Sequence, residues 1–311
     1  MSAYIQPADD VLRDTNDIGQ IGEGGDGAVH VFRGAPGHAF AVKYYKGEET
    51  TTYINECNTL TLLKDLRSPQ APPVIEIFAA DDPSTPHHRR IVLEYCPAGD
   101  LREYGLMHHK FQQRVEEVTL WRFYRNLVDG LAFLHSGYGT RHYGSTWRPI
   151  VHRDIKPSNI LLRLTGWNLA VPHQVVLADF GRAAFFNLHE PFFEGGTPNY
   201  TPPEQPYAGT EGDVWGVGAI MHFLALGKPP IADASEWPRR APMSDDDWRE
   251  IPRKAYPLVP KYSSQLDRLV LRALAFNPLE RWTAMQLVQA NWPVGTADDE
   301  ADVPMTILDE E

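Results

Sequence analysis

The sequence predicts an α+β fold of two lobes, in which a small β-rich N-terminal lobe with one main helix precedes a larger, mostly helical C-terminal lobe. Short β-rich runs separated by turn residues dominate the chain up to about residue 95. Beyond residue 100, apolar residues recur with helical spacing over long segments. At 311 residues, 42% of them hydrophobic, the chain is long enough to bury a core in each lobe.

The chain is expected to divide into a flexible lead-in, two lobes joined by a hinge, and a tail. The polar, acidic residues 1–17 are typical of a flexible N-terminal lead-in. The N-terminal lobe spans about 18–95, and a hinge at 94–100 joins it to the C-terminal lobe at about 101–290. Residues 294–311 form an acidic tail with little preference for helix or strand.

The elements of the N-terminal lobe follow from its local patterns. Two β-rich runs at 28–32 and 38–45 flank the turn sequence RGAPG and predict a hairpin. Apolar residues with a period of 3.6 indicate a helix over 51–66. The runs VIEIFAA (74–80) and RRIVLEYC (89–96) predict two further strands.

The C-terminal lobe is predicted to be built from helices. A long amphipathic helix is expected over 115–136, and apolar helices are expected around 213–226 and 263–275. Between the last two, residues 232–260 are rich in proline and charge and predict a loop.

Composition excludes several classes of protein. A net charge of −12 offers no basic face for phosphate contacts, so nucleic acid is not an expected partner. The two cysteines, Cys57 and Cys96, predict no disulfide framework, which fits a reducing compartment. No apolar run approaches the roughly 20 residues that span a bilayer, and the first residues lack the apolar stretch of a signal peptide. We therefore expect no membrane insertion and a cytoplasmic or nuclear location.

A glycine-rich stretch is the first candidate for chemistry. IGEGGDGAV (21–29) spaces Gly22, Gly24 and Gly27 as G-x-G-x-x-G, and its bare backbone N–H groups suit phosphate. Dinucleotide sites share this spacing, and so do flexible hairpins without a ligand. A dinucleotide site needs a helix after the glycines, whereas a second predicted strand follows here.

Lys43, in the strand sequence FAVK, is placed where its ammonium group could pair with phosphate oxygens. The alternative is a surface lysine whose stem lies along apolar residues. Glu56 borders the apolar stripe of the predicted helix and is the expected partner, ahead of Glu48 and Glu49 near the helix start. Its alternative is a solvated helix glutamate.

Two further segments place polar residues beside apolar runs. VHRDIKPSNILL (151–162) concentrates His, Arg, Asp, Lys and Asn, as a mixed-charge surface loop also would. In LADFG (177–181), Asp179 ends an apolar strand next to a glycine, which suits a Mg²⁺ ligand as well as an ordinary turn.

The order of these motifs along one chain resembles the eukaryotic protein kinase family over about residues 18–290. The resemblance implies the bilobal protein kinase fold, with the apolar flanks of VHRDIKPSNILL as buried strands and its polar centre facing the phosphates. GTPNYTPPE (196–204) is similar to the end of that family's activation segment, although Pro203 stands where alanine is usual.

Further matches to the family lie in the C-terminal half. GDVWGVGAIMHFLALGKPP resembles its buried helix, whose aspartate, here Asp213, would hold the catalytic loop. NPLERW supplies Arg281 as the implied partner of Glu204. Thr197 matches the threonine that bonds the catalytic aspartate, and with Lys156 it favours serine and threonine acceptors.

The resemblance implies transfer of the ATP γ-phosphoryl group to a protein hydroxyl, a reaction that needs positioning and charge neutralisation. Asp154 would accept the substrate hydroxyl proton, and Lys156 would contact the γ-phosphate. Lys43, held by Glu56, would grip the α- and β-phosphates.

The remaining implied roles concern metal and packing. Asn159 and Asp179 would hold Mg²⁺, whereas His152, Phe180 and Leu60 would pack as a spine.

A nucleotide site is implied between the glycine loop and the hinge. Adenine would lie between two apolar residues above and one below, with its edge bonded to hinge backbone and its ribose to an acid. Val29 and Ala41 would lie above the adenine and Leu161 below it, while the backbones of Glu94 and Cys96 would bond its edge. Asp100 would bond the ribose, and Leu93 would gate the back pocket. The phosphate loop would comprise Ile21, Gly22, Glu23, Gly24, Gly25, Asp26, Gly27 and Ala28.

The chain departs from the family in its activation segment, the stretch from Asp179 to Glu204. Between Asp179 and Thr197 there is no Ser, Thr or Tyr. We hypothesise that Glu190 or Glu194 supplies the negative charge that a phosphate would supply, so that activity does not depend on phosphorylation of this segment.

Two other departures concern spacing. The interval from Lys43 to Glu56 is short, which predicts a helix that begins late or sits differently. The loop at 136–150 is long and is expected on the surface.

Alternatives to an active kinase remain open. A pseudokinase would keep the fold as a nucleotide-binding scaffold or interaction module, and the short interval is the one feature that favours it. A small-molecule kinase of related fold would usually lack the PPE segment and the Asp213 helix.

Overall fold

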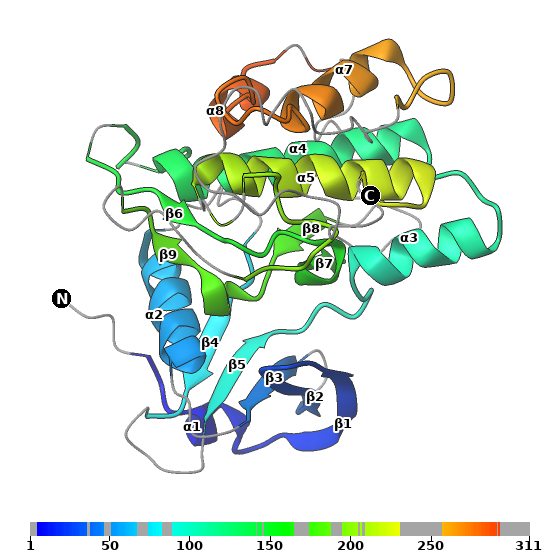
Figure 1. The fold of residues 1–311 in the computed structure, drawn as a ribbon. Helices are drawn as coiled ribbons and strands as arrows, with labels where there is room; N and C mark the ends of the chain where they lie inside the picture. The colour runs from blue at the N-terminus through cyan, green and yellow to red at the C-terminus, as the bar shows by residue number, and fades with distance from the viewer. Residues whose placement is uncertain are drawn as a thin grey trace, which may run out of the picture.

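Two lobes face each other in the computed structural model (Figure 1). The N-terminal lobe is a β-sheet with one main helix, and the C-terminal lobe is mostly a stack of helices. The chain that joins them runs from the last strand of the sheet into the first helix of the large lobe. The structure describes residues 5–35, 38–46, 51–66, 74–82, 89–140, 142–144, 146–164, 174–187, 195–204, 206, 209–230, 257–290 and 292.

The sheet of the N-terminal lobe has five antiparallel strands in the order β1-β2-β3-β5-β4. The predicted hairpin is confirmed, because β2 and β3 pair with Val29 opposite Lys43. The runs at 74–80 and 89–96 contain the two other predicted strands. The bounds are β1 (Asn16–Glu23), β2 (Gly27–Arg33), β3 (Ala39–Tyr45), β4 (Ile77–Ala80) and β5 (Arg90–Glu94).

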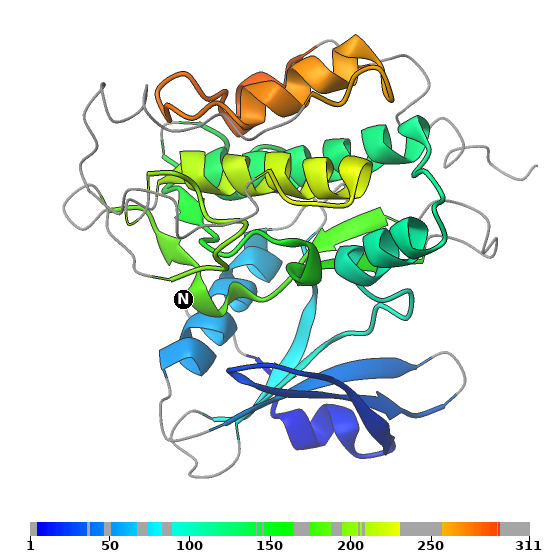
Figure 2. The same ribbon diagram turned by 45° about the vertical axis from the view of Figure 1, so that its right-hand side comes forward.

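Helix α2 (Thr51–Leu66) has the bounds that the apolar period predicts. Tyr53, Glu56, Leu60 and Leu63 recur every three to four residues and are its buried side chains. The helix therefore turns one face, which includes a carboxylate, into the protein. Figure 2 shows α2 running from the sheet toward the C-terminal lobe.

Helix α1 (Ala8–Leu12) corrects the expectation of a flexible lead-in over residues 1–17. Ala8 and Leu12 are buried and pack with Val42, Ala79 and Val92 on the outer face of the sheet. One helical turn supplies too short a pattern to identify in sequence, and its stability comes from this packing.

The described part of the C-terminal lobe contains five α-helices, and the long helix and two apolar helices expected from sequence are among them. Helix α5 is buried nearly all round, which agrees with its uniformly apolar sequence. Gly137 and Gly227, both with left-handed φ, end α4 and α5. The bounds are α3 (Leu101–Lys110), α4 (Glu117–Ser136), α5 (Thr210–Leu226), α7 (Ser264–Ala273) and α8 (Ala284–Val288).

Two small antiparallel pairs lie on the side of this lobe that faces the N-terminal lobe (Figure 1). β6 (Ile150–Val151) pairs with β9 (Ala184–Phe185), and β7 (Ile160–Arg163) pairs with β8 (Gln174–Leu177). The apolar flanks of VHRDIKPSNILL are thus buried strands, as predicted, with a 3₁₀ turn at Pro157–Asn159 between them.

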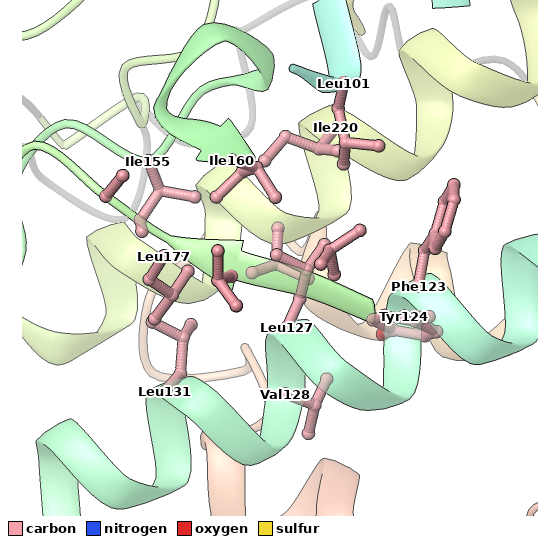
Figure 3. Packing of buried hydrophobic residues seen from close by; sticks show 14 of the residues in the cluster. Leu101, Phe123, Tyr124, Leu127, Val128, Leu131, Ile155, Ile160, Leu177 and Ile220 are labelled. Carbon is pink, nitrogen blue, oxygen red and sulfur yellow. The ribbon is translucent and has the colours of Figure 1, made fainter. Parts of the chain in front are cut away.

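The core of the C-terminal lobe lies directly behind these pairs. Figure 3 shows Leu127 and Leu131 of α4 gathered with Ile160, Leu177 and Ile220, side chains from three other elements. All five are nearly inaccessible to solvent. The loop between β6 and β7 therefore starts and ends on a rigid base.

Several expectations lie outside the described residues. These are the acidic tail at 294–311 and most of the loop at 232–260. Within the described part of the chain, no helix combines the length and apolarity needed to cross a membrane.

Candidate active site

Three side chains from distant parts of the chain meet between the lobes. Lys43, on β3, has its Nζ 2.7 Å from Glu56 Oε2 and 2.8 Å from Asp179 Oδ1. The predicted pairing of Lys43 with Glu56 is confirmed. Because α2 begins at Thr51, Glu56 lies in its second turn, and the short interval from Lys43 does not displace it.

These charges control one another. Burial lowers the pKa of Lys43, but the negative charges of Glu56 and Asp179 outweigh burial and raise that pKa above its ordinary value. For Asp179, burial acts to raise the pKa, but the positive charge of Lys43 outweighs burial, and the pKa of Asp179 lies below its ordinary value. Lysine and aspartate therefore both stay charged at neutral pH.

Asp154, between β6 and β7, is the centre of a second cluster. Its Oδ1 accepts a 3.1 Å hydrogen bond from the Thr197 hydroxyl. Its Oδ2 lies 2.8 Å from Lys156 Nζ and 3.3 Å from Asn159 Nδ2. The structure thus places three residues with implied roles around the carboxylate of Asp154, a residue that is only 6% exposed.

Buried Asp213 of helix α5 holds the loop that carries Asp154. Its Oδ2 accepts the backbone amide of His152 at 2.7 Å, and its Oδ1 accepts that of Arg153 at 2.9 Å. The His135 ring also lies 3.0 Å from Oδ2. The expected hold of Asp213 on this loop is therefore present.

Two buried aromatic rings pack against each other beside the same loop. The rings of His152 and Phe180 lie 4.7 Å apart between centroids, and both side chains are fully buried with Leu60 in the interior. Asp179 itself has a left-handed backbone (φ 65°), which starts the turn into Phe180.

The expected metal ligands have suitable chemistry. Asn159 Nδ2 donates to Asp154, both to its backbone oxygen at 2.9 Å and to its carboxylate, so the Asn159 side-chain oxygen is left as an acceptor. With Asp179 it offers hard oxygen donors of the kind that Mg²⁺ prefers. Among the described residues, no group of three His, Cys, Asp or Glu side chains could hold a metal by itself. Mg²⁺ sites typically combine one or two carboxylates with substrate phosphates, and the residues present fit such a site.

The glycine loop joins β1 to β2. Gly24 N donates to Gly27 O at 2.8 Å and closes the turn, and a Cβ at Gly24 or Gly25 would meet nothing within 4 Å. Gly27 differs, because a Cβ there would lie 1.8 Å from Tyr44 O. Packing against β3 by itself explains the glycine at position 27.

The expected adenine contacts lie at the hinge and on the two lobes. Ala41 is paired with Leu93 across β3 and β5, and both are buried, as is Cys96. Asp100 caps helix α3, where its Oδ1 accepts the backbone N–H of Glu103 at 2.8 Å. This cap explains the aspartate structurally, and its contact with ribose stays a prediction.

The activation segment is anchored at its end. Arg281 donates from Nη1 and Nη2 to the two carboxylate oxygens of Glu204 at 2.5 and 2.9 Å, as expected. Glu190 and Glu194, the hypothesised substitutes for a phosphate, lie outside the described residues.

Sequence reasoning missed several contacts at this site. The Tyr45 hydroxyl donates to Glu56, and Asn55 donates to backbone oxygens after Asp179. Strand alternation could have identified Tyr45, since it shares a face with Lys43. No sequence signal points to the ion pair of Glu94 with Arg163, which ties the hinge to β7.

Comparison with known proteins agrees with this geometry. The family model described as the protein kinase domain matches residues 15–293. Serine/threonine protein kinase OSK3 of Oryza sativa subsp. indica is 28% identical over 264 residues, which cover 82% of this chain and 45% of the relative. The carbon catabolite-derepressing protein kinase of Secale cereale is 30% identical over 250 residues, 76% of this chain and 41% of the relative.

Aurora kinase C of Mus musculus is 27% identical over 210 residues, which cover 65% of this chain and 63% of the relative. The chain spans less than half the length of the two plant relatives. The family match covers both lobes and every motif described above, and the chain therefore belongs to the protein kinase family.

Proposed function

We propose that the chain transfers the γ-phosphoryl group of ATP to serine or threonine hydroxyls of proteins. The observation that carries the proposal is the arrangement around Asp154, whose carboxylate meets Thr197 on one oxygen and Lys156 on the other. A base placed in this way orients the acceptor oxygen, and a neighbouring cation offsets the charge of the transferring group.

Each charged side chain of the site has a part in this proposal. Lys43, kept charged by Glu56 and Asp179, binds the α- and β-phosphates. Asn159 and Asp179 hold Mg²⁺, which when bound neutralises phosphate charge. Asp154 accepts the proton of the substrate hydroxyl.

Two residues support acceptors of the Ser/Thr class. Lys156 lies two residues after Asp154, and Thr197 bonds the same aspartate, the combination that the sequence resemblance associates with these acceptors. The proposed partners are proteins with such acceptors rather than nucleic acid, given the net charge of −12. A cytoplasmic or nuclear location is also proposed, supported by two free cysteines.

Transfer of label from γ-³²P-ATP to serine- and threonine-containing peptide arrays tests the proposal. We expect incorporation of label by the wild type and none above background by Asp154→Ala. A thermal unfolding curve for each protein shows that both are folded. Equal incorporation by both would remove Asp154 from the chemistry. Binding of Mg²⁺·ATP by the wild type without transfer would instead indicate the pseudokinase alternative.

A further inference from the structure

Tyr45 touches both members of the central ion pair. It follows Lys43 by two positions on β3, so both side chains lie on one face of the strand. The Tyr45 hydroxyl donates to Glu56 Oε2, the same oxygen that pairs with Lys43 Nζ. The ammonium group also lies 4.9 Å from the centre of the Tyr45 ring.

The Glu56 carboxylate depends on these donors. It has no exposure to solvent, and its other oxygen accepts the backbone N–H of Phe180 at 3.3 Å. A buried carboxylate that loses a donor is left partly unsatisfied, because water cannot replace the donor. Burial and the charge of Glu56 raise the pKa of Tyr45, so its hydroxyl keeps the proton that it donates.

Asn55, the residue before Glu56, fastens the same helix to the start of the activation segment. Its Nδ2 lies 3.4, 2.9 and 2.6 Å from the backbone oxygens of Phe180, Gly181 and Ala183. Two neighbouring residues of α2 therefore contact opposite sides of the site. Glu56 contacts the strand that carries Lys43, and Asn55 contacts the segment after Asp179.

We propose that Tyr45 and Asn55 are positioning residues, which keep helix α2 in place and the lysine–glutamate pair formed without a phosphate on the activation segment. The inference rests on the proposed function, since it concerns how the nucleotide-binding lysine is held. It agrees with the absence of Ser, Thr and Tyr between Asp179 and Thr197. All the contacts that carry it join residues of this chain.

The first experiment removes only the Tyr45 hydroxyl. Tyr45→Phe keeps the ring, which packs edge-on against Tyr53 at 5.2 Å. In bacterially made protein shown by mass spectrometry to carry no phosphate, we expect roughly tenfold weaker binding of Mg²⁺·ATP, or about 1.4 kcal/mol, and a lower kcat. Tyr44→Phe is the matched control, because Tyr44 lies on the opposite face of β3, where it packs against the buried cluster that includes Ala8 and Leu12 of helix α1.

A double-mutant cycle separates positioning from general destabilisation. If Tyr45 acts through Glu56, Y45F should weaken Mg²⁺·ATP binding less than twofold in the E56Q background. A tenfold loss in both backgrounds would overturn the proposed role. A melting temperature for each variant shows that the comparison is made on folded protein.

Asn55 is tested by loss and rescue. Asn55→Ala should lower kcat/KM for ATP about tenfold in phosphate-free protein, and Asn55→His, which keeps a nitrogen donor at similar reach, should recover part of it. Activity of Asn55→Ala equal to wild type would contradict the proposal, and the histidine variant remains informative if the alanine variant does not fold.

Measurements on the wild type distinguish failure of this inference from failure of the proposed function. Phosphate-free protein that turns over only after an upstream kinase acts on it would overturn the inference. Protein that binds Mg²⁺·ATP but never transfers phosphate would refute the proposed function, whereas the effect of Tyr45→Phe on nucleotide affinity would still test the positioning role.

Discussion

The backbone amide of Arg153 donates a 2.9 Å hydrogen bond to Asp213 Oδ1, and Arg153 has a left-handed backbone with φ of 70°. Such a conformation costs a non-glycine residue on the order of 1–3 kcal/mol and persists only where the surroundings enforce it. Helix α5 enforces it here, because its buried carboxylate, that of Asp213, accepts hydrogen bonds from two successive amides of the loop that carries Asp154. The next residue, Asp154, is thereby aimed at the site.

Replacing Asp213 should therefore affect both stability and turnover. Asp213→Asn keeps the shape but leaves one acceptor oxygen for two amides, and hydrogen bonds to charged groups contribute roughly 1.5–3 kcal/mol each. We expect a loss of about 2 kcal/mol in urea unfolding and a kcat at least tenfold lower. Glu211→Gln, in the first turn of the same helix, is the control. An unchanged kcat for Asp213→Asn would show that the loop is held by other contacts.

The ion pair of Arg281 with Glu204 makes a second prediction. Both side chains are almost completely buried, at 0% and 4% exposure, so Arg281→Met leaves a carboxylate without its cation. Removing one partner of such a pair costs about 3–5 kcal/mol, measurable in urea unfolding. Combining Arg281→Met with Glu204→Gln should recover part of the loss, and exposed Arg268→Met should cost little. A double variant no more stable than Arg281→Met would contradict this account.

Metal dependence of nucleotide binding makes a third prediction. A ligand that binds only the folded protein at a hundred times its Kd stabilises it by about 2.7 kcal/mol. We expect ATP to raise the melting temperature of the wild type with Mg²⁺ and much less with EDTA. Asp179→Asn should abolish the difference, since it removes a proposed metal ligand and a partner of Lys43.

Asp65→Asn, on the exposed face of α2, should behave as wild type. A full Mg²⁺-dependent shift in Asp179→Asn would exclude Asp179 as a ligand.

The two thiols, of which Cys96 is buried and Cys57 is partly buried, make a fourth prediction, at alkaline pH. Burial raises the pKa of Cys57 and of Cys96 from 9.0 to about 12. Above pH 9 the unfolded chain loses these protons while the folded chain keeps them, so the stability present below pH 9 is lost as the pH rises toward 12. Each thiol contributes up to about 1.4 kcal/mol per pH unit to this loss.

Urea unfolding between pH 8 and 10 measures that slope. The wild type should lose stability more steeply than the double variant Cys57→Ala, Cys96→Ala, whose other groups titrate alike. Parallel slopes would mean that the thiols ionise as readily in the folded protein as in the unfolded chain.

Much of the fold could be predicted from local pattern. The helix over 51–66 and the hairpin of β2 and β3 follow from apolar periods and turn residues, which act over a few neighbouring positions. Helix α1 could not be predicted, because five residues carry no period and only the sheet beneath Ala8 and Leu12 stabilises them.

The candidate site divides in the same way. Lys43, Glu56, Asp154 and Asp179 were predicted to belong to one site because the order of their motifs along the chain resembles the protein kinase family, whereas each motif taken singly also fitted an ordinary loop, turn or surface residue. It did not determine that Tyr45 would share a glutamate oxygen with Lys43, or that Asn55 would reach three backbone oxygens after Asp179.

By itself, then, the sequence predicted the two-lobed architecture, and its resemblance to the protein kinase family predicted most of the residues that meet in the candidate site. Only the tertiary structure decided how those residues meet, as when Lys43 pairs with an aspartate 136 positions away. The physical reason is that such contacts depend on how α2 and α5 pack into their lobes, and packing is a property of side chains brought together from the whole chain rather than of any single motif.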